Sequence, residues 1–410
     1  MNEKTHQKYP PSVQHGIPRL SPAHKGWKSF AIGKLVAEVI RPVEMDDDKT
    51  YTLVTAKRSR GGIVKREELK GREIAVKKQF YIQTGDFVIS KRQIVHGACG
   101  FVPKELEGSI VSNEYLVLSF TDKVIPQFWD FLTHTIYFQQ VCFHSSIGVH
   151  VEKMLFNVSR WYQWKVNIPT LKEQEKIASF LGAVDTRLTQ LRRKHKLLQT
   201  YKRGVMQKIF SQQIRFKDND GQPFPNWEKK KIKELGNVIT GNTPSTNEKA
   251  FYNGNYLFVS PADIQNKRYI YETKTTLTEQ GFKQGRLVKK SSILFVCIGS
   301  TIGKIAQAGK DCITNQQINS VIVNRENNSG FVYLVLQYQS SRIKKMAGEH
   351  AVPILNKSDF QEIKLQIPFV KEQERIADFF TAIDKKIEAV AQQIKLTEQF
   401  KKGLLQKIFV

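Results

Sequence analysis

The sequence predicts an α+β protein with two mixed α/β globules, each followed by a long helix, and with the two helices pairing as an antiparallel coiled coil. Three observations support this fold class. One segment occurs twice, apolar residues in both copies follow heptad spacing, and the regions before them contain β-branched runs interrupted by glycine. A length of 410 residues predicts two or three domains, and the duplicated segment predicts an internal pseudo-two-fold repeat.

Each globule is expected to contain twisted strands as well as helices. The first half contains the run DFVISKRQIVHGACGF, and the second half contains SILFVCIGSTIGKIA in a similar place. Runs of this kind, broken by glycine, are typical of strands joined by tight turns. The predicted divisions are residues 1–168 for the first globule, 169–215 for the first helix and linker, 216–367 for the second globule and 368–410 for the second helix.

The two helices are expected where the internal repeat is strongest. Residues 168–210 align with residues 367–409 at an offset of 199, and 19 of the 43 aligned positions are identical, which excludes chance. Both copies begin with Ile-Pro, continue with KEQE and end with QKIF. Proline before an acidic first turn favours a helix start, because carboxylates there face the positive end of the helix dipole. At about 1.5 Å per residue, each helix should be roughly 60 Å long.

Apolar residues in both helices recur at alternating intervals of four and three. This spacing is typical of the narrow seam through which two helices pack as a coiled coil. The predicted seam residues are Ile177, Leu181, Val184, Leu188 and Leu191 in the first helix and Ile376, Phe380, Ile383, Ile387, Val390 and Ile394 in the second. At the helix starts, we expect two matched Glu-Gln pairs to complement the dipole and to tie each helix to its globule. These residues are Glu173, Gln174, Glu372 and Gln373.

The charge of the chain indicates a polyanionic partner. Lys and Arg number 64 against 38 Asp and Glu, which gives a formal net charge of +26 and a pI of about 9.8. The basic residues form clusters throughout both halves, with aromatic residues between them. Together these features favour nucleic-acid binding over a plain solvated surface.

Other classes of protein and site are disfavoured by what the sequence lacks. No apolar run approaches the roughly 18 residues of a membrane span, and the N-terminal segment has no apolar stretch like that of a signal peptide. We therefore expect a cytoplasmic location and no membrane partner. The four cysteines form no CxxC pair, so we expect neither a metal site nor a disulfide framework. The stretch GSTIGKI has the wrong glycine spacing for a phosphate-binding loop and is expected to be a turn between strands.

The order of segments is globule, IPxxxEQxxI helix, FPNW restart, second globule and second IPxxxEQxxI helix, and it resembles the specificity subunits of type I restriction-modification systems. The second half carries the closer match, in PFPNWEKKKIKELGNVITGNTPS from Pro223 to Ser245, GSTIGKIA, NQQIN and the terminal KKGLLQKIF. The resemblance implies a subunit with no catalytic residues and no cofactor of its own. Each globule would be a target-recognition domain that reads one half of a bipartite double-stranded DNA sequence, with the antiparallel helices as the spacer.

The resemblance also implies partner subunits. Two modification subunits, which bind S-adenosylmethionine and methylate adenine, would dock on this subunit, and restriction subunits with motor and nuclease activity would join for cleavage. ATP and magnesium would accordingly be bound by the partners. The physics of a split target agrees, because phosphate contacts carry no sequence information and two base-reading surfaces must be held at a fixed separation.

Candidate DNA contacts are polar and basic side chains on loops at the edge of each globule, because such side chains reach base edges and phosphates. In the first globule, these residues are Lys57, Arg58, Arg60, Lys91 and Arg92. In the second globule, they are Asn242, Thr243, Ser245, Thr246, Lys304, Asn315 and Gln316.

Two other functions stay open on the residues alone. Asp263 with Glu272 and Lys274 would suit a metal-dependent DNA nuclease, because two carboxylates can hold a metal ion and a lysine can polarise a phosphate. The charge and the helices would also suit a coiled-coil architectural protein that coats nucleic acid without sequence preference. A methyltransferase is not indicated, because the chain has neither a glycine-rich cofactor turn nor an Asn-Pro-Pro-aromatic motif.

Overall fold

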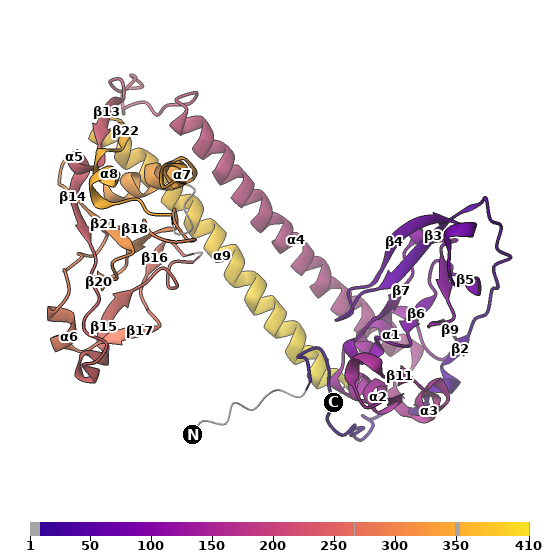
Figure 1. The fold of residues 1–410 in the computed structure, drawn as a ribbon. Helices are drawn as coiled ribbons and strands as arrows, with labels where there is room; N and C mark the ends of the chain where they lie inside the picture. The colour runs from indigo at the N-terminus through magenta and orange to yellow at the C-terminus, as the bar shows by residue number, and fades with distance from the viewer. Residues whose placement is uncertain (1–8, 266, 349–352, 410) are drawn as a thin grey trace. The chain divides into compact units, whose positions relative to one another are not determined.

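A computed structural model describes residues 9–265, 267–348 and 353–409. The chain divides into two compact units. The first unit contains residues 1–191 and 393–410, and the second contains residues 192–392. The divisions fall inside the two 40-residue helices, α4 (Leu171–Phe210) and α9 (Val370–Phe409), so each helix contributes one part to each unit (Figure 1).

The first unit contains two four-stranded sheets, with strand orders β2-β9-β6-β7 and β4-β3-β8-β5. Neighbours in the first sheet are antiparallel, whereas β3 and β8 of the second sheet pair in parallel. The strands are β2 (Val36–Glu38), β3 (Thr50–Ala56), β4 (Ile63–Lys70), β5 (Gln79–Tyr81), β6 (Phe87–Ser90), β7 (Cys99–Phe101), β8 (Ile110–Ser112) and β9 (Tyr115–Phe120). Two short antiparallel pairs are added, β1 (Lys28–Ala31) with β12 (Lys165–Ile168) and β10 (Ser146–Ile147) with β11 (Leu155–Phe156).

Three short helices of the first unit begin at residues suited to helix starts. They are α1 (Pro126–Thr133), α2 (Ile136–His144) and α3 (Val158–Gln163). Proline opens α1, the Thr135 hydroxyl accepts a hydrogen bond from the first turn of α2, and the Asn157 side chain does the same for α3. The helices share one hydrophobic core with β6 and β9, in which Trp129 and Trp161 are fully buried.

The second unit contains a five-stranded sheet of order β14-β21-β18-β19-β16 and a three-stranded sheet of order β17-β15-β20. The strands are β14 (Gly236–Thr240), β15 (Tyr252–Val259), β16 (Tyr269–Ile270), β17 (Thr275–Leu277), β18 (Ile293–Val296), β19 (Ile305–Ala308), β20 (Cys312–Thr314) and β21 (Ile318–Val323). A separate antiparallel pair joins β13 (Glu228–Lys231) and β22 (Lys364–Ile367). The helices before α9 are α5 (Ile232–Leu235), α6 (Glu279–Lys283), α7 (Ser329–Met346) and α8 (Lys357–Glu362).

The two units share a topology, which confirms the predicted internal repeat. The order β2-β9-β6-β7 in the first unit corresponds to β14-β21-β18-β19 in the second. The parallel pair β3 and β8 corresponds to the parallel pair β15 and β20, and β1 with β12 corresponds to β13 with β22. The predicted turn GSTIGKI connects β18 to β19, so this stretch joins two strands.

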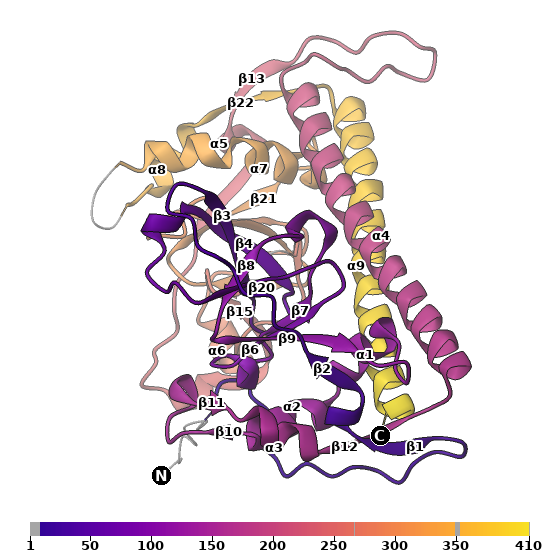
Figure 2. The ribbon, with the colours of Figure 1, turned by 90° about the vertical axis from the view of Figure 1, so that its right-hand side faces the viewer.

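Within the first unit, the start of α4 lies beside the end of α9, so the two helices are antiparallel. The Trp27 indole Nε1 donates to Glu173 Oε1 at 3.0 Å, and the Phe409 ring packs against Trp27 with centroids 6.3 Å apart. Figure 2 shows this end of α9 beside α1. Further along the helices, Lys401 Nζ lies 2.7 Å from Asp185 Oδ1.

Within the second unit, the same arrangement occurs with the helices exchanged. The Trp227 indole Nε1 donates to Glu372 Oε2 at 3.1 Å, and the Phe210 ring packs against Trp227 with centroids 6.1 Å apart. Lys202 Nζ lies 2.6 Å from Asp384 Oδ1. At the 199-residue offset, this aspartate and lysine correspond to those of the first unit, so each unit holds one copy of the same ion pair.

The glutamine of each helix start ties its helix to the preceding globule, as predicted. Gln174 Oε1 accepts from Ile125 N at 2.9 Å, and its amide donates to the Lys123 carbonyl at 2.8 Å. Gln373 Oε1 accepts from Asn328 N at 2.9 Å in the same way. Both amides also donate to the carbonyl of the proline before the helix, at 3.0 Å. Both glutamines are buried, so these bonds satisfy groups that water does not reach.

Most of the predicted seam residues are buried. Those buried are Leu181, Val184, Leu188, Leu191, Ile376, Phe380, Ile383 and Val390, and those half-buried are Ile177, Ile387 and Ile394. Near each helix start, these side chains belong to the core of the globule. Leu181 packs in the core of the first unit, and Ile376 and Phe380 pack in the core of the second. The residues at heptad spacing therefore do not all pack in the same way. Those near each helix start pack in the core of a globule.

All four cysteines are buried and free of disulfide bonds. Burial raises the pKa of the Cys99, Cys297 and Cys312 thiols to about 12, which keeps them protonated near neutral pH. Among the described residues, no helix combines the length and the apolar character needed to cross a membrane.

Candidate nucleic-acid interface

Two basic turns of the first unit meet at the ends of β3 and β6. Ser59 N donates to the His96 carbonyl at 2.7 Å, and Arg60 N donates to the Gly97 carbonyl at 2.8 Å. Arg58 Nε donates to the side chain of Gln93 at 2.9 Å. The turn after β3 and the segment after β6 are therefore joined by backbone and side-chain bonds, and the predicted contacts in these two segments share one surface.

Four of the five predicted contacts in the first unit have accessible cationic groups. Lys57 is exposed, and Lys91 Nζ donates to the Asn113 carbonyl at 2.9 Å. Arg58 lies 2.5 Å from Glu152, and Arg92 lies 2.5 Å from Glu114, with all four side chains at least two-fifths exposed. Exposed ion pairs contribute only about 0–1 kcal/mol, so DNA phosphates can replace these carboxylates at low cost.

Arg60 differs from its neighbours because its guanidinium turns into the unit. Its Nε donates to the Thr133 carbonyl at 2.5 Å, and burial lowers the pKa of this group. Both Ser59 and Arg60 have positive φ, 55° and 56°, so the backbone of this turn is held in the left-handed region. Arg60 is half-buried and holds the turn in place, so it is less accessible than its neighbours, and its predicted DNA contact stays a prediction.

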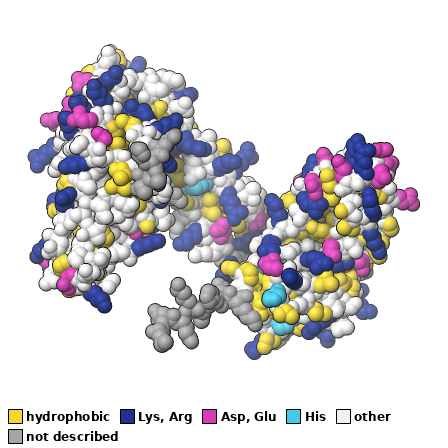
Figure 3. Space-filling model, in the orientation of Figure 1, with side chains coloured by type: hydrophobic (Ala, Val, Ile, Leu, Met, Phe, Trp, Pro, Cys, Tyr) yellow, Lys and Arg dark blue, Asp and Glu magenta, His cyan; other side chains and the backbone are white. Residues whose placement is uncertain are grey.

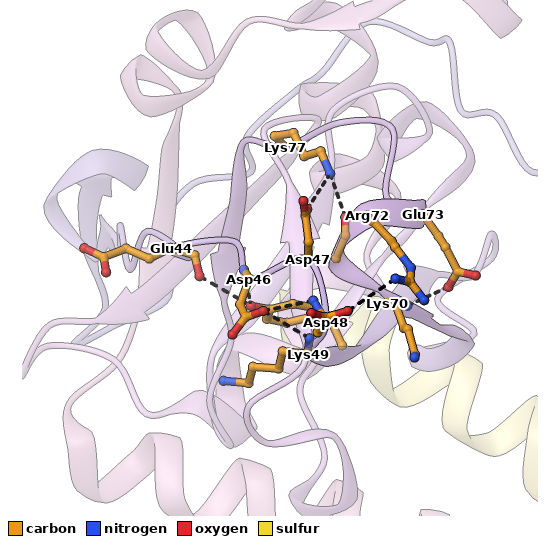
Figure 4. A network of polar contacts seen from close by, with 11 residues as sticks. Glu44, Asp46, Asp47, Asp48, Lys49, Lys70, Arg72, Glu73 and Lys77 are labelled. Carbon is orange, nitrogen blue, oxygen red and sulfur yellow. Dashed lines mark hydrogen bonds and ion pairs between the residues drawn. The ribbon is translucent and has the colours of Figure 1, made fainter.

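The loop before β3 contains a run of three aspartates that lies among basic side chains. The turn after the strand is basic, whereas the loop before it contains Asp46, Asp47 and Asp48 (Figure 4). Asp46 Oδ1 accepts from two backbone amides of its own loop, at 2.9 and 3.4 Å. Asp47 lies 3.5 Å from Lys77, and Asp48 lies 3.3 Å from Arg72. Neighbouring lysine and arginine side chains therefore offset the charge of these aspartates, and the loop is not a strongly acidic surface.

Lys and Arg side chains are spread over the visible faces of both units (Figure 3). Basic residues alone therefore do not single out one surface. The stronger indication is the convergence of separate loops on one place, because base reading needs several polar side chains held together.

In the second unit, the GNTPST loop meets two other loops. Thr243 Oγ1 donates to Gln316 Oε1 at 2.7 Å, and Asn242 Nδ2 donates to the Gln284 carbonyl at 2.9 Å. A Cβ at Gly241 would lie 2.2 Å from the Thr314 carbonyl oxygen, so only glycine allows this close approach. The structure thus brings residues 241–246 and 314–317 together. Each of these two loops contains predicted contacts of the second unit.

The other predicted contacts of the second unit have different roles. Ser245 and Thr246 are exposed on the loop, where they can reach a ligand. Asn315 is engaged in its own turn, since its amide donates to Gln317 Oε1 at 3.0 Å and its Oδ1 accepts from Gln317 N at 3.2 Å. Lys304 is exposed on the turn between β18 and β19, where the Ile298 carbonyl accepts from Gln317 at 3.5 Å.

Arg286 belongs to this surface, although the sequence pattern did not indicate it. Arg286 N donates to Asn242 Oδ1 at 3.0 Å, and its Nη1 donates to the Thr240 carbonyl at 2.8 Å. The side chain is exposed and has no carboxylate within ion-pair distance among the described residues. It lies between Lys283 and the Lys289–Lys290 pair, in the stretch KQGRLVKK, and only the structure shows its contact with the GNTPST loop.

The residues of the nuclease alternative line one open recess, but Asp263 is occupied. Asp263 Oδ2 accepts from Ser260 N at 2.9 Å and from Ser260 Oγ at 2.7 Å, while Oδ1 accepts from Lys274 N at 2.9 Å. The carboxylate therefore caps its own loop. Glu272 is almost fully exposed and lies 3.5 Å from Lys267. Across residues 9–265, 267–348 and 353–409, no cluster of three metal-ligating side chains occurs.

A family model described as the type I restriction modification DNA specificity domain matches the chain twice, at residues 25–199 and 225–398. Over 208 residues, the chain is 29% identical to the type I restriction enzyme MjaIX specificity subunit of Methanocaldococcus jannaschii. This alignment covers 49% of this chain and 48% of that protein. Over 147 residues, it is 35% identical to the type I restriction enzyme HindI specificity subunit of Haemophilus influenzae, which covers 35% of this chain and 32% of that protein. The matched stretches thus span half or less of these relatives.

The fold is also similar to a solved structure. The type I restriction-modification system S subunit from M. genitalium superimposes with a TM-score of 0.59 at 15% sequence identity, covering 96% of this chain and 99% of that chain. The similarity of fold therefore extends through both units and both long helices.

Proposed function

The chain belongs to the type I restriction modification DNA specificity domain family, and from this premise we propose that each unit reads one half of a bipartite double-stranded DNA target. The observation that carries the proposal is the duplication of a complete unit with its own loop surface. Two similar units in one chain suit a split target, because each can contact one short sequence through the major groove.

Base reading is assigned to the loop surfaces and DNA affinity to the surrounding cations. In the second unit, Gln316 and Arg286 carry amide and guanidinium groups of the kind that read adenine and guanine edges, while the Asn242 amide holds the loops together. In the first unit, Arg58 and Arg92 have that role, with Lys57 and Lys91 as phosphate contacts. These assignments are supported by the exposure of the side chains and by the loops that bring them together.

Both helices contribute to both units, which supports a role in spacing the two half-sites. Each helix end is anchored in a core. Phe409 packs with the first unit and Phe210 with the second. We assign to α4 and α9 the spacing of the half-sites, so that inserting whole helical turns into both helices would change the number of unread base pairs. Insertion into one helix alone would shift α4 relative to α9, so the ion pairs Asp185–Lys401 and Asp384–Lys202 could not both form.

Two exposed apolar pairs support docking of two copies of one partner. Leu197 and Tyr201 on α4 are 59% and 53% exposed, and Leu396 and Phe400 on α9 are 53% and 54% exposed. Each pair is spaced i, i+4 and therefore lies on one helix face. The pairs correspond at the 199-residue offset, so they would offer equivalent sites. We assign these sites to two modification subunits, with restriction subunits joining the assembly, and S-adenosylmethionine, ATP and magnesium to those partners.

A domain exchange tests the proposal. The chain is co-purified with its modification subunits, and methylated positions are mapped in DNA before and after residues 216–367 are exchanged for the corresponding residues of another family member. One half of the recognised sequence should change and the other half should stay. If both halves change, or if neither does, the proposal is contradicted.

Competition separates this function from non-specific coating. A specificity subunit should keep its preferred split site in excess random DNA at physiological salt, because base contacts survive where phosphate contacts are screened. Loss of all preference under these conditions would favour the architectural alternative. Incubation of the isolated chain with DNA and magnesium checks the nuclease alternative, which would be supported only by cutting that Asp263→Ala abolishes.

A further inference from the structure

The hairpin formed by β10 and β11 has one buried face and one exposed apolar face. Ser146 pairs with Phe156 and Ile147 pairs with Leu155 across the strands. The first pair is buried, whereas Ile147 is 59% and Leu155 is 47% exposed. Because side chains alternate between the faces of a strand, Ile147 and Leu155 lie side by side on the open face. Val149, in the connecting loop, is 97% exposed.

The connecting loop is tightly built, so the exposed side chains are presented by a defined backbone. Gly148 has a φ of 153°, and a Cβ at this position would lie 3.0 Å from Met154 Cα. The base of the hairpin is closed by a hydrogen bond from Asn157 N to the Ser145 carbonyl at 2.7 Å. Single exposed apolar residues are ordinary on protein surfaces, but here an exposed apolar pair, Ile147 and Leu155, lies on the same hairpin as the exposed Val149, which requires an explanation.

The hairpin is attached to the basic turns of the first unit. Glu152 lies 2.5 Å from Arg58 and 3.2 Å from His96, and Phe156 N donates to the Lys91 carbonyl at 2.9 Å. The apolar side chains therefore adjoin the surface that carries the candidate DNA contacts of this unit. The cations on this surface are Lys57, Arg58, Lys91, Arg92 and Lys153, and the carboxylates paired with them are Glu114 and Glu152. A polyanion suits the net charge of these surroundings, whereas an apolar protein surface would have to desolvate them.

We propose that this hairpin enters the DNA major groove and that Ile147, Val149 and Leu155 contact the 5-methyl groups of thymine in the first half-site. The major groove admits a two-stranded β-ribbon, and the thymine methyl is the apolar feature that it displays. The flanking arginines and lysines would hold the phosphates on either side. The inference rests on the proposed function and adds to it a recognised base, because the first half-site must then contain at least one A·T pair.

Thymine methyl groups can be removed from DNA without changing base pairing. Each thymine of the mapped half-sites is replaced by deoxyuridine, and affinity is measured for the full chain in complex with its modification subunits. At one or more thymines of the first half-site, affinity should fall roughly threefold to tenfold, the range expected for lost burial of a methyl group or two. Val149→Ala should cause a similar loss on normal DNA and no further loss on the deoxyuridine duplex.

Matched variants make the result specific to the hairpin. Val149→Thr keeps the shape of the side chain but replaces one methyl group with a hydroxyl, and it should lose only part of the thymine preference because one methyl group remains. Ile40→Ala removes another residue of the first unit that is 64% exposed, and it should bind like the unaltered chain. Because Val149 and Ile40 are both exposed, neither change should unfold the unit.

Three outcomes would overturn this inference without affecting the proposed function. The first is a first half-site without thymine, and the second is a set of hairpin variants that bind DNA like the unaltered chain. The third is independence of the two changes, in which the affinity lost by Val149→Ala is the same on the deoxyuridine duplex as on normal DNA. In each of these cases, the unaltered chain still prefers its split target. If the unaltered chain shows no preference for any split target, the proposed function itself fails, which makes the two failures distinguishable.

Discussion

The two long helices start with the same Glu-Gln motif, but the two glutamates lie in different environments. Glu173 is partly exposed and accepts one bond, from Trp27. Glu372 is fully buried and accepts from Trp227, and also from Arg215 at 3.2 and 2.6 Å. A carboxylate removed from water needs charge compensation, so the second unit requires an arginine that the first does not. The Glu-Gln motif is the same in both copies of the repeat, but the burial of its glutamate decides whether a charged partner is required.

Replacing Arg215 should produce the largest difference between the units. In Arg215→Met, the buried carboxylate of Glu372 keeps only its bond to Trp227, and we expect a loss of about 3–5 kcal/mol in the unfolding free energy. Hydrogen exchange followed by mass spectrometry would place the loss in peptides of the second unit. Glu173→Gln is the control in the first unit, with an expected cost of about 1 kcal/mol. Equal losses in the two variants would show that burial of the glutamate is unimportant.

The aromatic ends of the helices offer a second comparison. Phe210 is buried and stacks on Tyr338, with centroids 5.0 Å apart, whereas Phe409 is half-buried. Phe210→Ala should destabilise the second unit by about 3 kcal/mol and Phe409→Ala the first by about 1–2 kcal/mol, because a half-exposed ring leaves a smaller cavity. Denaturant titrations read by hydrogen exchange would measure both. A larger loss in Phe409→Ala would contradict this ranking.

Acid should weaken the first unit more than the second. Burial, aided by the charges of Arg60 and Lys401 and opposed by Asp185, lowers the pKa of His134 to about 4. A histidine with a lowered folded pKa contributes stability that is complete above about pH 6.5 and is lost as the pH falls towards 4. Burial raises the pKa of Asp130, which opposes this loss in part.

The expected loss for the first unit is about 1–2 kcal/mol between pH 7 and pH 5. The described part of the second unit has one histidine, His195, which is partly exposed on α4, so we expect a smaller change there. His134→Gln should remove most of the difference when exchange is measured at both pH values. If this variant keeps the full acid sensitivity, another group is responsible.

The repeated ion pairs should give the smallest effect. Asp384 is 27% exposed beside Lys202, and Asp185 is 41% exposed beside Lys401. Lys202→Met should cost about 1 kcal/mol and Lys401→Met about 0.5 kcal/mol, because the more exposed pair is better screened by water. Double-mutant cycles with Asp384→Asn and Asp185→Asn would isolate each pair. Coupling energies in the opposite order would contradict the role of exposure.

The helices were predictable because the periodicity of a helix is local in sequence. The repeat was predictable because one segment of the chain can be aligned directly with another. Seam residues such as Leu181 and Phe380 recur at heptad spacing, and a buried helix face must show such a period. Their division between globule core and helix packing was not visible, since both environments select the same apolar side chains. The strands of the globules were indicated by glycine-broken runs, but the pairing of strands depends on contacts distant in sequence.

The candidate DNA surface was predictable only in part. Thr243 and Gln316 were both identified from sequence, but their direct contact was not, because it joins residues 73 positions apart. Arg60 was assigned to the surface because it sits in a basic cluster, and composition does not reveal that a guanidinium turns inward to a carbonyl. Arg286 was missed because nothing in the sequence around it indicates its contact with Asn242, which is 44 positions away and is made only through folding.

The sequence by itself determined the duplication, the two 40-residue helices, their buried faces and the basic character of the chain, because periodicity and charge are properties of the string of residues. Only the tertiary structure decided which loops share a surface, that Glu372 needs Arg215, and that an apolar hairpin adjoins Arg58. Those facts depend on side chains brought together across long stretches of chain by strand pairing and core packing, for which no local pattern exists.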